Sequence, residues 1–126
     1  MERTKLILIV DDEPPIRRVL ELMFKNGGYQ TLLAANGEEA LIIIERDKPD
    51  AVITDINMPR MNGRKLCELT DHLKRERPFL TIIMTARIMP DEQQWIEVMH
   101  ETMFMEKPFS PTRLRDSIDR YFGVQR

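Results

Sequence analysis

The sequence predicts an α/β domain in which one parallel sheet is covered by helices on both faces. Short aliphatic runs such as Leu6–Val10 have no polar face, which is typical of strands buried on both sides. The segments between these runs carry apolar residues three and four positions apart, the spacing of amphipathic helices. Five runs alternate with five helical segments, an order that requires crossovers between parallel strands. A length of 126 residues provides for one domain.

The first half of the chain contains three expected strands and two expected helices. The first helix begins at Pro14-Pro15, because proline suits the first helical turn, and ends at Gly27-Gly28. Its apolar residues recur at helical spacing from Ile16 to Phe24 and include Val19. The second helix opens at Asn36-Gly37 and has Ala40, Leu41 and Ile44 on its inner face. The strands are expected at residues 6–10, 29–34 and 51–54.

The second half is punctuated by proline. A loop at residues 58–63 leads into a third helix, which Leu66, Leu69 and Leu73 mark and which stops before Pro78. A fourth helix starts at Pro90-Asp91 and contains Trp95, Val98 and Met99. Ser110-Pro111 is a good start for the last helix, with a cap followed by a first-turn proline. The strands are expected at residues 80–84 and 103–105.

Charge and cysteine content exclude several classes of protein. Nineteen basic and 21 acidic residues give a net charge of −2, which is unlike a nucleic-acid binder. Charges of alternating sign on the last helix favour a solvated face. Cys67 is the single cysteine, so no intramolecular disulfide can form. With no signal peptide and no apolar run long enough to span a membrane, we expect a cytoplasmic protein.

Polar side chains follow four of the expected strands. In open α/β sheets the ligand site lies beyond the carboxyl ends of the strands, so we expect these residues to converge. Clustered carboxylates are costly without a cation, and Mg²⁺ suits oxygen ligands with room for water and phosphate. A carboxylate beside Mg²⁺ can also act as a nucleophile toward a phosphoryl group. The residues are Asp11, Asp12 and Glu13 after the first strand, Asp55 after the third, Thr85 after the fourth and Lys107 after the fifth.

Four short motifs at these strand ends resemble the signatures of response-regulator receiver domains, the CheY-like domains of two-component signalling. They occur in the order of that family, and the resemblance extends from Lys5 to about Phe122. It implies a doubly wound, flavodoxin-like sheet of strand order 2-1-3-4-5. The motifs are Val10-Asp11-Asp12-Glu13-Pro14, Asp55-Ile56-Asn57-Met58-Pro59 with Met61-Asn62-Gly63, Thr85-Ala86, and Lys107-Pro108-Phe109.

The resemblance implies a role for each residue near the expected site. Asp55 would be the phosphoacceptor. Asp12 would bind Mg²⁺ directly and Asp11 through water, with Asp55 and the backbone carbonyl of Asn57 completing the metal ligands. Lys107 would pair with the phosphoryl oxygens, Thr85 would hydrogen-bond the phosphoryl group, and Phe104 would be the switch aromatic. The family also suggests a cis peptide bond between Lys107 and Pro108.

The implied activity is signalling and not enzymatic turnover. The donor would be a histidine kinase or a histidine phosphotransfer protein. Phosphorylation would alter the surface of the fourth helix, fifth strand and fifth helix, which could also form a homodimer. We expect residues 1–126 to be a receiver domain with its core at about 5–122 and no output domain. It would act either by protein contact or as the receiver part of a larger protein, without contacting nucleic acid or membrane.

Three features depart from the family pattern or tune it. Where many members have Gly-Ala-Asp-Asp before the switch position, this chain has His100-Glu101-Thr102-Met103, so the turn there could be shaped differently. Phe104 lacks the hydroxyl of the tyrosine that many members carry. Arg87 and Asn57 stand where they could affect dephosphorylation.

Other classes of protein remain as alternatives. A metal-dependent phosphohydrolase with an aspartate nucleophile usually carries a general-acid aspartate two positions later, and here that residue is Asn57. A phosphorylation-independent interaction module on the same fold would not need the acidic pair, the threonine and the lysine. A nucleotide-binding flavodoxin-like protein would be expected to have a glycine-rich loop after the first strand, which this sequence lacks.

Overall fold

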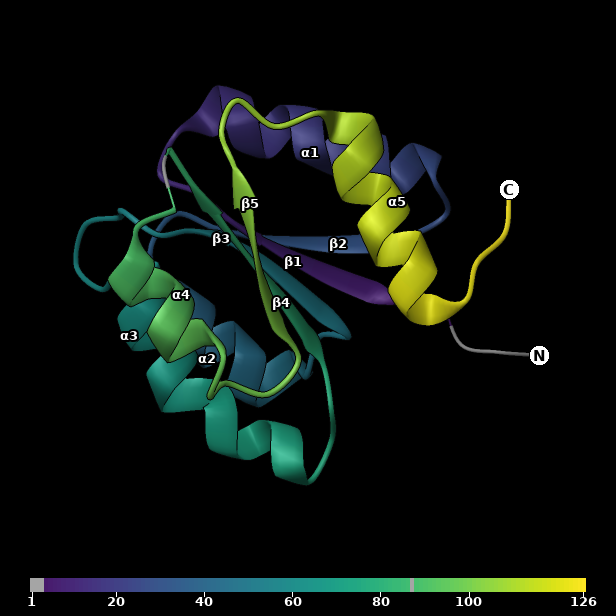
Figure 1. Cartoon of the computed structure of the whole chain (residues 1–126). Helices are drawn as coiled ribbons and strands as arrows, with labels where there is room; N and C mark the ends of the chain where they lie inside the picture. Colours follow the sequence, from purple (N-terminus) through teal and green to yellow (C-terminus); the bar gives the residue numbers. More distant parts are fainter. Residues whose placement is uncertain (1–3, 87) are drawn as a thin grey trace.

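The fold is known from a computed structural model that describes residues 4–86 and 88–126. Its sheet has five parallel strands in the order β2-β1-β3-β4-β5, as the sequence and the family resemblance predict (Figure 1). Each strand lies where the sequence predicts it. Compared with the expected bounds, β2 begins one residue later, β3 and β4 end one residue later, and β5 is one residue longer at each end. The strands are β1 (Leu6–Val10), β2 (Gln30–Ala34), β3 (Ala51–Asp55), β4 (Leu80–Thr85) and β5 (Thr102–Glu106).

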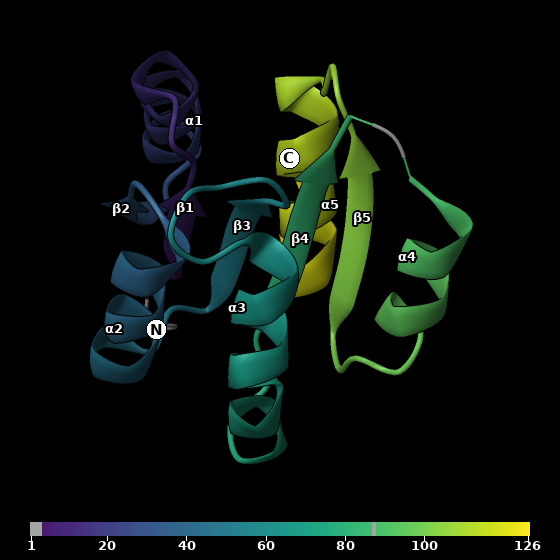
Figure 2. The same cartoon turned by 90° about the vertical axis from the view of Figure 1, so that its left-hand side faces the viewer.

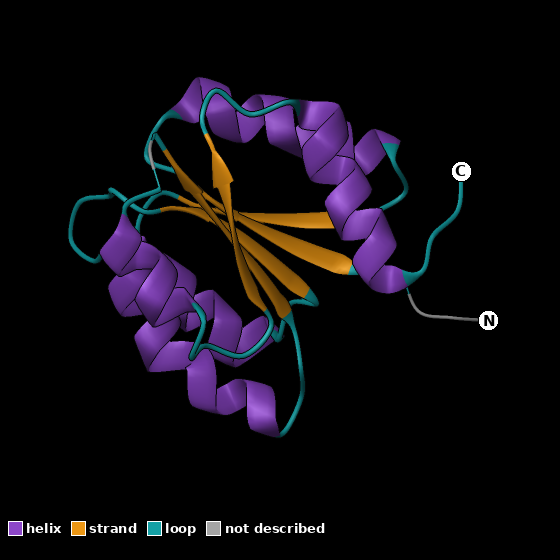
Figure 3. Cartoon of the chain, in the orientation of Figure 1, coloured by secondary structure: helices purple, strands orange, loops and turns teal. Residues whose placement is uncertain are grey.

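Helices cover both faces of the sheet, which confirms the doubly wound α/β class. Helices α1 and α5 lie on one face and α2, α3 and α4 on the other (Figures 1 and 3), and Figure 2 shows α4 beside β5 at the edge of the sheet. Among the helices in the described part of the chain, none combines the length and the apolar character that a membrane crossing requires. The helices are α1 (Pro14–Asn26), α2 (Gly37–Asp47), α3 (Gly63–Thr70), a 3₁₀ turn η1 (Asp71–Arg75), α4 (Pro90–Ile96) and α5 (Pro111–Phe122).

The core has two layers, one on each face of the sheet. Side chains alternate along a strand, so Ile7 and Ile9 of β1 pack beneath α1 and α5, while Leu8 and Val10 pack toward α2 and α3. All four are fully buried. This explains why the run had to be apolar at every position.

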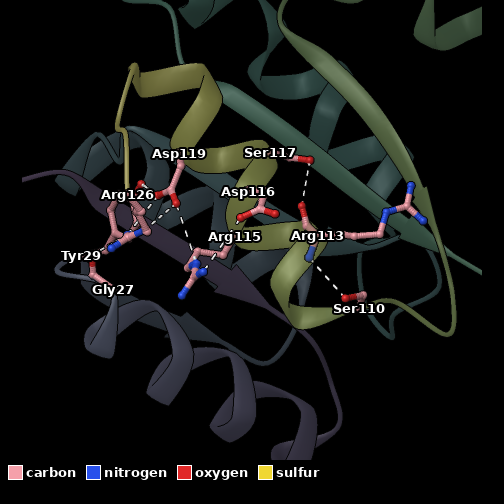
Figure 4. Close-up of polar contacts among 9 residues, drawn as sticks. All are labelled: Gly27, Tyr29, Ser110, Arg113, Arg115, Asp116, Ser117, Asp119 and Arg126. Atoms are coloured by element: carbon pink, nitrogen blue, oxygen red, sulfur yellow. Dashed lines mark hydrogen bonds and ion pairs between the residues drawn. The ribbon is translucent and has the colours of Figure 1, made fainter.

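Local capping explains where the helices begin. Asn36 accepts a hydrogen bond from the Glu39 N–H (3.0 Å), and Asn62 accepts one from the Lys65 N–H (2.8 Å). Ser110 Oγ accepts from the Arg113 N–H at the start of α5 (Figure 4). These bonds satisfy N–H groups that have no partner within the first helical turn.

A polar cluster around the buried Asp119 joins α5 to the α1–β2 turn (Figure 4). The Tyr29 hydroxyl donates to Asp119, and Arg126 Nε donates to the same carboxylate at 2.7 Å while its Nη2 donates to the Gly27 carbonyl at 2.8 Å. Burial acts to raise the pKa of Asp119, but the hydrogen bonds from Arg126 and Tyr29 outweigh it and lower that pKa. Asp119 is therefore a buried anchor, whereas the sequence pattern suggested a solvated position.

Two helices differ from the expected boundaries. The third helix changes to a 3₁₀ turn after Thr70, and its residue Leu69 is 37% exposed. The fourth helix ends at Ile96, so Val98 lies outside it and is 74% exposed. In α1 the buried residues are Leu20 and Phe24, while Val19 is 52% exposed. Helical spacing predicted the apolar face of each helix, but it did not predict which residues at the edge of that face would be buried.

The α4–β5 turn is held by a buried lysine. Lys74 of η1, which is 5% exposed, donates to the carbonyls of His100 (2.6 Å) and Glu101 (3.1 Å) and to Thr102 Oγ1 (3.0 Å). The Asp71 carboxylate accepts from the His100 N–H and lies 2.8 Å from the His100 ring. Glu101 adopts a left-handed φ of 48°, a conformation that favours glycine. These contacts from η1 hold a turn in which His100, Glu101 and Thr102 replace smaller residues.

The buried state of Lys74 predicts a contribution to stability that grows with pH. Burial lowers the pKa of Lys74 from 10.5 to about 8. Between these two values the unfolded chain keeps a proton on this lysine that the folded chain has released, so the contribution of Lys74 to the free energy of unfolding rises with pH, by about 3 kcal/mol at pH 10.5. Burial also raises the pKa of Cys67 and of Tyr29, and their contributions fall over the same range. In urea unfolding, the free energy of unfolding of the wild type minus that of Lys74→Met should therefore increase by this amount between pH 7 and pH 10.5, whereas the difference from Lys65→Met, which removes an exposed lysine, should stay constant. Parallel pH profiles for the wild type and Lys74→Met would contradict this account.

Candidate functional site

Three carboxylates meet at the carboxyl edge of the sheet. Asp11 and Asp12 follow β1, and Asp55 is the last residue of the neighbouring strand β3. Each offers an oxygen, and these oxygens all lie within 4.8 Å of one another. Asp11 and Asp55 are buried, whereas Asp12 is exposed. The site therefore has a buried floor and one side open to solvent.

Asp11 fits a role as a cation ligand. One of its oxygens accepts a hydrogen bond from the Glu13 N–H at 2.9 Å, but the other, Oδ2, is buried and has no hydrogen-bond partner in the part of the chain that the structure describes. Burial raises the pKa of Asp11, and the neighbouring Asp55 carboxylate adds to this against the Glu13 hydrogen bond. A hard cation would satisfy the orphaned oxygen and offset the repulsion between the carboxylates.

Lys107 forms the cationic side of the site. Its ammonium lies 2.7 Å from Asp55 Oδ2, while Asp55 Oδ1 accepts from the Asn57 N–H at 3.3 Å. Burial acts to lower the pKa of Lys107, but the hydrogen bond and charge of Asp55, with smaller effects of Asp11 and Glu13, outweigh it and raise that pKa. Lys107 is therefore a fixed positive charge at neutral pH.

The backbone after β5 aims Lys107 at the carboxylates. The Lys107 N–H donates to the Thr85 carbonyl at 2.6 Å, which extends the pairing of β4 with β5 by one bond. The Lys107–Pro108 peptide bond is cis, as the family resemblance suggested. Because these groups belong to the strand ends and the turn after them, their positions depend on the sheet itself.

Thr85 and Phe104 lie on β4 and β5, which are neighbouring strands. Thr85 ends β4 and is 3% exposed. Phe104 is paired in register with Ile83, two residues before Thr85, so all three face the same side of the sheet. The ring of Phe104 is half-buried and meets Trp95 edge-on, with 5.6 Å between ring centroids. Arg87 falls outside the described residues.

Comparison with known proteins identifies the family. A family model described as the response regulator receiver domain matches residues 7–119. This chain belongs to the response regulator receiver family. It is 36% identical to sporulation initiation phosphotransferase F of Bacillus subtilis (strain 168) over 119 residues, which cover 94% of each protein. Its fold matches that of the chemotaxis protein CheY4 of Vibrio cholerae with a TM-score of 0.84 and 27% identity, covering 94% of this chain and 98% of that one.

Several curated relatives of this receiver domain are longer. The chain is 38% identical to the probable transcriptional regulator ycf27 of Porphyra purpurea over 113 residues, which are 89% of this chain but 45% of that protein. It thus spans about half the length of the ycf27 relatives it matches. The match places it as a receiver domain of two-component signalling, a family whose members generally bind Mg²⁺ at an acidic pocket.

Sequence reasoning about the receiver site missed three contacts. Arg17 Nη1 donates to the Asp11 carbonyl at 2.6 Å, and Thr54 Oγ1 donates to the Asp55 carbonyl at 3.0 Å. These two hydrogen bonds hold the backbone of Asp11 and of Asp55 in place. Gly63 lies against the Asp55 backbone, and its N–H donates to the Ile56 carbonyl at 2.9 Å. Among these, only Gly63 stood in a motif that the sequence singled out, and the motif did not show the reason for glycine.

The position of Gly63 predicts a strong effect of a single methyl group. A Cβ at this residue would lie 2.5 Å from the Asp55 carbonyl oxygen and 3.0 Å from Ile56 Cα, so the backbone that holds the phosphoacceptor candidate would have to move. We expect Gly63→Ala to lower the free energy of unfolding by about 1 to 3 kcal/mol. Urea denaturation measures this, with the exposed Lys65→Ala in the same helical turn as control. Equal stabilities of the two variants would show that the contact is not limiting.

Proposed function

We propose that this receiver domain accepts a phosphoryl group on Asp55 from a histidine kinase or a histidine phosphotransfer protein. The observation that carries the proposal is the Asp55 carboxylate itself, which lies between the Lys107 ammonium at 2.7 Å and the carboxylates of Asp11 and Asp12. It is the only one of the three acids that contacts a charged amine among the described residues. This arrangement suits a nucleophile whose product carries additional negative charge.

The transfer would exchange one phosphorus bond for another. An oxygen of Asp55 attacks the phosphorus of the phosphohistidine, and a P–O bond forms as the P–N bond breaks. The imidazole nitrogen leaves with the electron pair, and the product is an acyl phosphate. Lys107 would neutralise charge on the transferred oxygens, and the Thr85 hydroxyl would donate a hydrogen bond to one of them.

We propose Mg²⁺ as the cofactor. Asp11, Asp12 and Asp55 would hold it, together with the backbone carbonyl of Asn57. Bound there, it would supply charge neutralisation for the phosphoryl oxygens. The unpartnered Oδ2 of Asp11 supports this assignment.

The proposed output is a change in the surface formed by α4, β5 and α5. Thr85 ends β4, the strand next to that of Asp55, and Phe104 lies on β5 within that surface. Movement of the threonine toward the phosphoryl group would then allow Phe104 to turn inward. Met103 is 38% exposed on β5 and Met89 is 41% exposed before α4, which suits an adaptable protein contact. We propose a downstream protein or a second copy of the chain as the partner, in a cytoplasmic setting that the single buried cysteine suits.

The residue two positions after the acceptor separates signalling from hydrolysis. Asn57 is exposed and cannot serve as a general acid, so we propose that the chain promotes only its own phosphorylation and dephosphorylation. Asn57 would then influence only how fast the acyl phosphate is lost.

Intact-mass measurement with a small phosphodonor tests the function. Incubation with acetyl phosphate should add one phosphoryl group in the presence of Mg²⁺ and far less in EDTA. The same protein should not turn over p-nitrophenyl phosphate. The proposal fails if no adduct forms under conditions that label another receiver domain, and sustained turnover would favour the phosphohydrolase.

A further inference from the structure

Helix α4 is attached to the domain chiefly through one side chain. Trp95 is the buried residue of this seven-residue helix and is 7% exposed. It is also the single tryptophan of the sequence. Most other residues of α4 are exposed, and Glu92 and Ile96 are half-buried. The position of α4 therefore depends on what surrounds this indole.

The ring of Trp95 contacts side chains on two other elements, β5 and α3, within a larger core cluster. The ring of Phe104 on β5 meets it edge-on at 5.6 Å with an interplanar angle of 82°, and the guanidinium of Arg64 on α3 lies 5.2 Å from its centroid. The indole Nε1 is buried and has no hydrogen-bond partner among the described residues. Burying an N–H without an acceptor is unfavourable, so this packing holds the indole at a cost. A small displacement that gave the N–H an acceptor would recover that cost.

The core cluster around Trp95 contains residues on or directly after β3, β4 and β5, and β3 and β4 end at the proposed phosphorylation site. Its other members are Ile56, Cys67 and Ile83, with Phe104 packed against them. Ile56 directly follows Asp55, and Ile83 lies two residues before Thr85 on the same face of β4. Asp55 and Thr85, which would contact the phosphoryl group, are therefore close in the chain to Ile56 and Ile83 of the cluster around the indole.

The segment that follows α4 is fixed. Lys74 and Asp71 hold His100 and Glu101 against η1, as described above. A change around Trp95 is therefore not absorbed by the turn before β5. It can be relieved by a displacement of α4 relative to that anchored turn.

We propose that Trp95 couples the phosphorylation state of Asp55 to the position of α4, because its indole packs against Phe104 and Arg64 and is the main anchor of that helix. This inference rests on the proposed function. When Phe104 turns inward, the indole loses its edge-on partner, becomes more exposed and gains an acceptor for its N–H in solvent. The coupling is reciprocal in free energy, so a change at Trp95 also alters the affinity of the Asp55 site for a phosphoryl analogue.

Tryptophan fluorescence reads this coupling directly, since Trp95 is the only tryptophan. The full chain is incubated with acetyl phosphate and Mg²⁺, and each sample is divided between emission spectroscopy and intact-mass analysis. We expect emission to shift to longer wavelength in proportion to the adduct, and no shift in Asp55→Asn. Absence of an adduct contradicts the proposed function, whereas an adduct without a shift overturns the coupling alone.

Variants separate coupling from plain packing. Phe104→Tyr keeps the ring and should keep the shift per mole of adduct, while Phe104→Leu should lose most of it; circular dichroism verifies that both are folded. Trp95→Phe should change the dissociation constant of beryllium fluoride, a phosphoryl analogue, by roughly 5-fold or more in a calorimetric titration with Mg²⁺, a usual size for coupling between sites. Gln94→Leu, on the exposed side of the same helix, serves as the matched control. A full shift in Phe104→Leu, or an unchanged dissociation constant in Trp95→Phe, would show that Trp95 only fills space.

Discussion

Replacing Lys107 with methionine is expected to slow phosphorylation of Asp55 by roughly 100-fold, the usual effect of removing one preorganised charge from a reaction site. The ammonium lies 2.7 Å from Asp55 Oδ2, and the Lys107 N–H is fixed on the Thr85 carbonyl, so the charge is already in place before a donor arrives. Methionine keeps the length of the side chain but removes the charge. Among the described residues, the buried acids would then lack the one amine that faces them.

Rates of adduct formation from acetyl phosphate, followed by intact mass, measure this effect. Lys65→Met removes a lysine on the exposed surface of α3 and should leave the rate unchanged. Urea unfolding shows whether each variant is folded. A folded Lys107→Met that is labelled at the wild-type rate would remove Lys107 from the mechanism.

Mg²⁺ is expected to stabilise the folded domain, and Asp11→Asn to abolish that effect. A ligand at 100 times its dissociation constant adds about 2.7 kcal/mol to the free energy of unfolding. Without Mg²⁺, the variant should be more stable than the wild type. Its amide can still accept from the Glu13 N–H, and it no longer places a buried charge near Asp55.

Thermal unfolding with and without Mg²⁺ checks both parts. Glu45→Gln, which removes an exposed acid in the last turn of α2, near the start of β3 and not its carboxyl end, should respond to Mg²⁺ like the wild type. Equal Mg²⁺ responses in Asp11→Asn and the wild type would place the metal elsewhere. A less stable Asp11→Asn in the absence of Mg²⁺ would show that the charge repulsion is not significant.

The sheet was predictable because its strands are apolar at consecutive positions. Leu6–Val10 has to fill both core layers, and no helix or surface strand needs such a run. The convergence of Asp11, Asp55 and Lys107 followed from the same pattern, since parallel strands end at one edge. For these residues, the position at the end of a strand in the sequence is enough to predict the position in the folded domain.

The α4–β5 region was less predictable because its stability comes from distant partners. Lys74 contacts a turn 26 to 28 residues away, and neither its burial nor the early end of α4 has a local signal. Val98 matched the helical spacing but had no element to pack against. Gly63 was noted only as part of a motif, because its close approach to Asp55 depends on the path of two loops.

Loss of the adduct in Asp55→Asn tests the central claim most directly. Asparagine keeps the shape of the side chain and can still accept from the Asn57 N–H, but it is not a nucleophile. After incubation with acetyl phosphate and Mg²⁺, the intact mass of the wild type should increase by one phosphoryl group and that of Asp55→Asn should not change. An equal increase in a folded Asp55→Asn would place phosphorylation elsewhere and contradict the account.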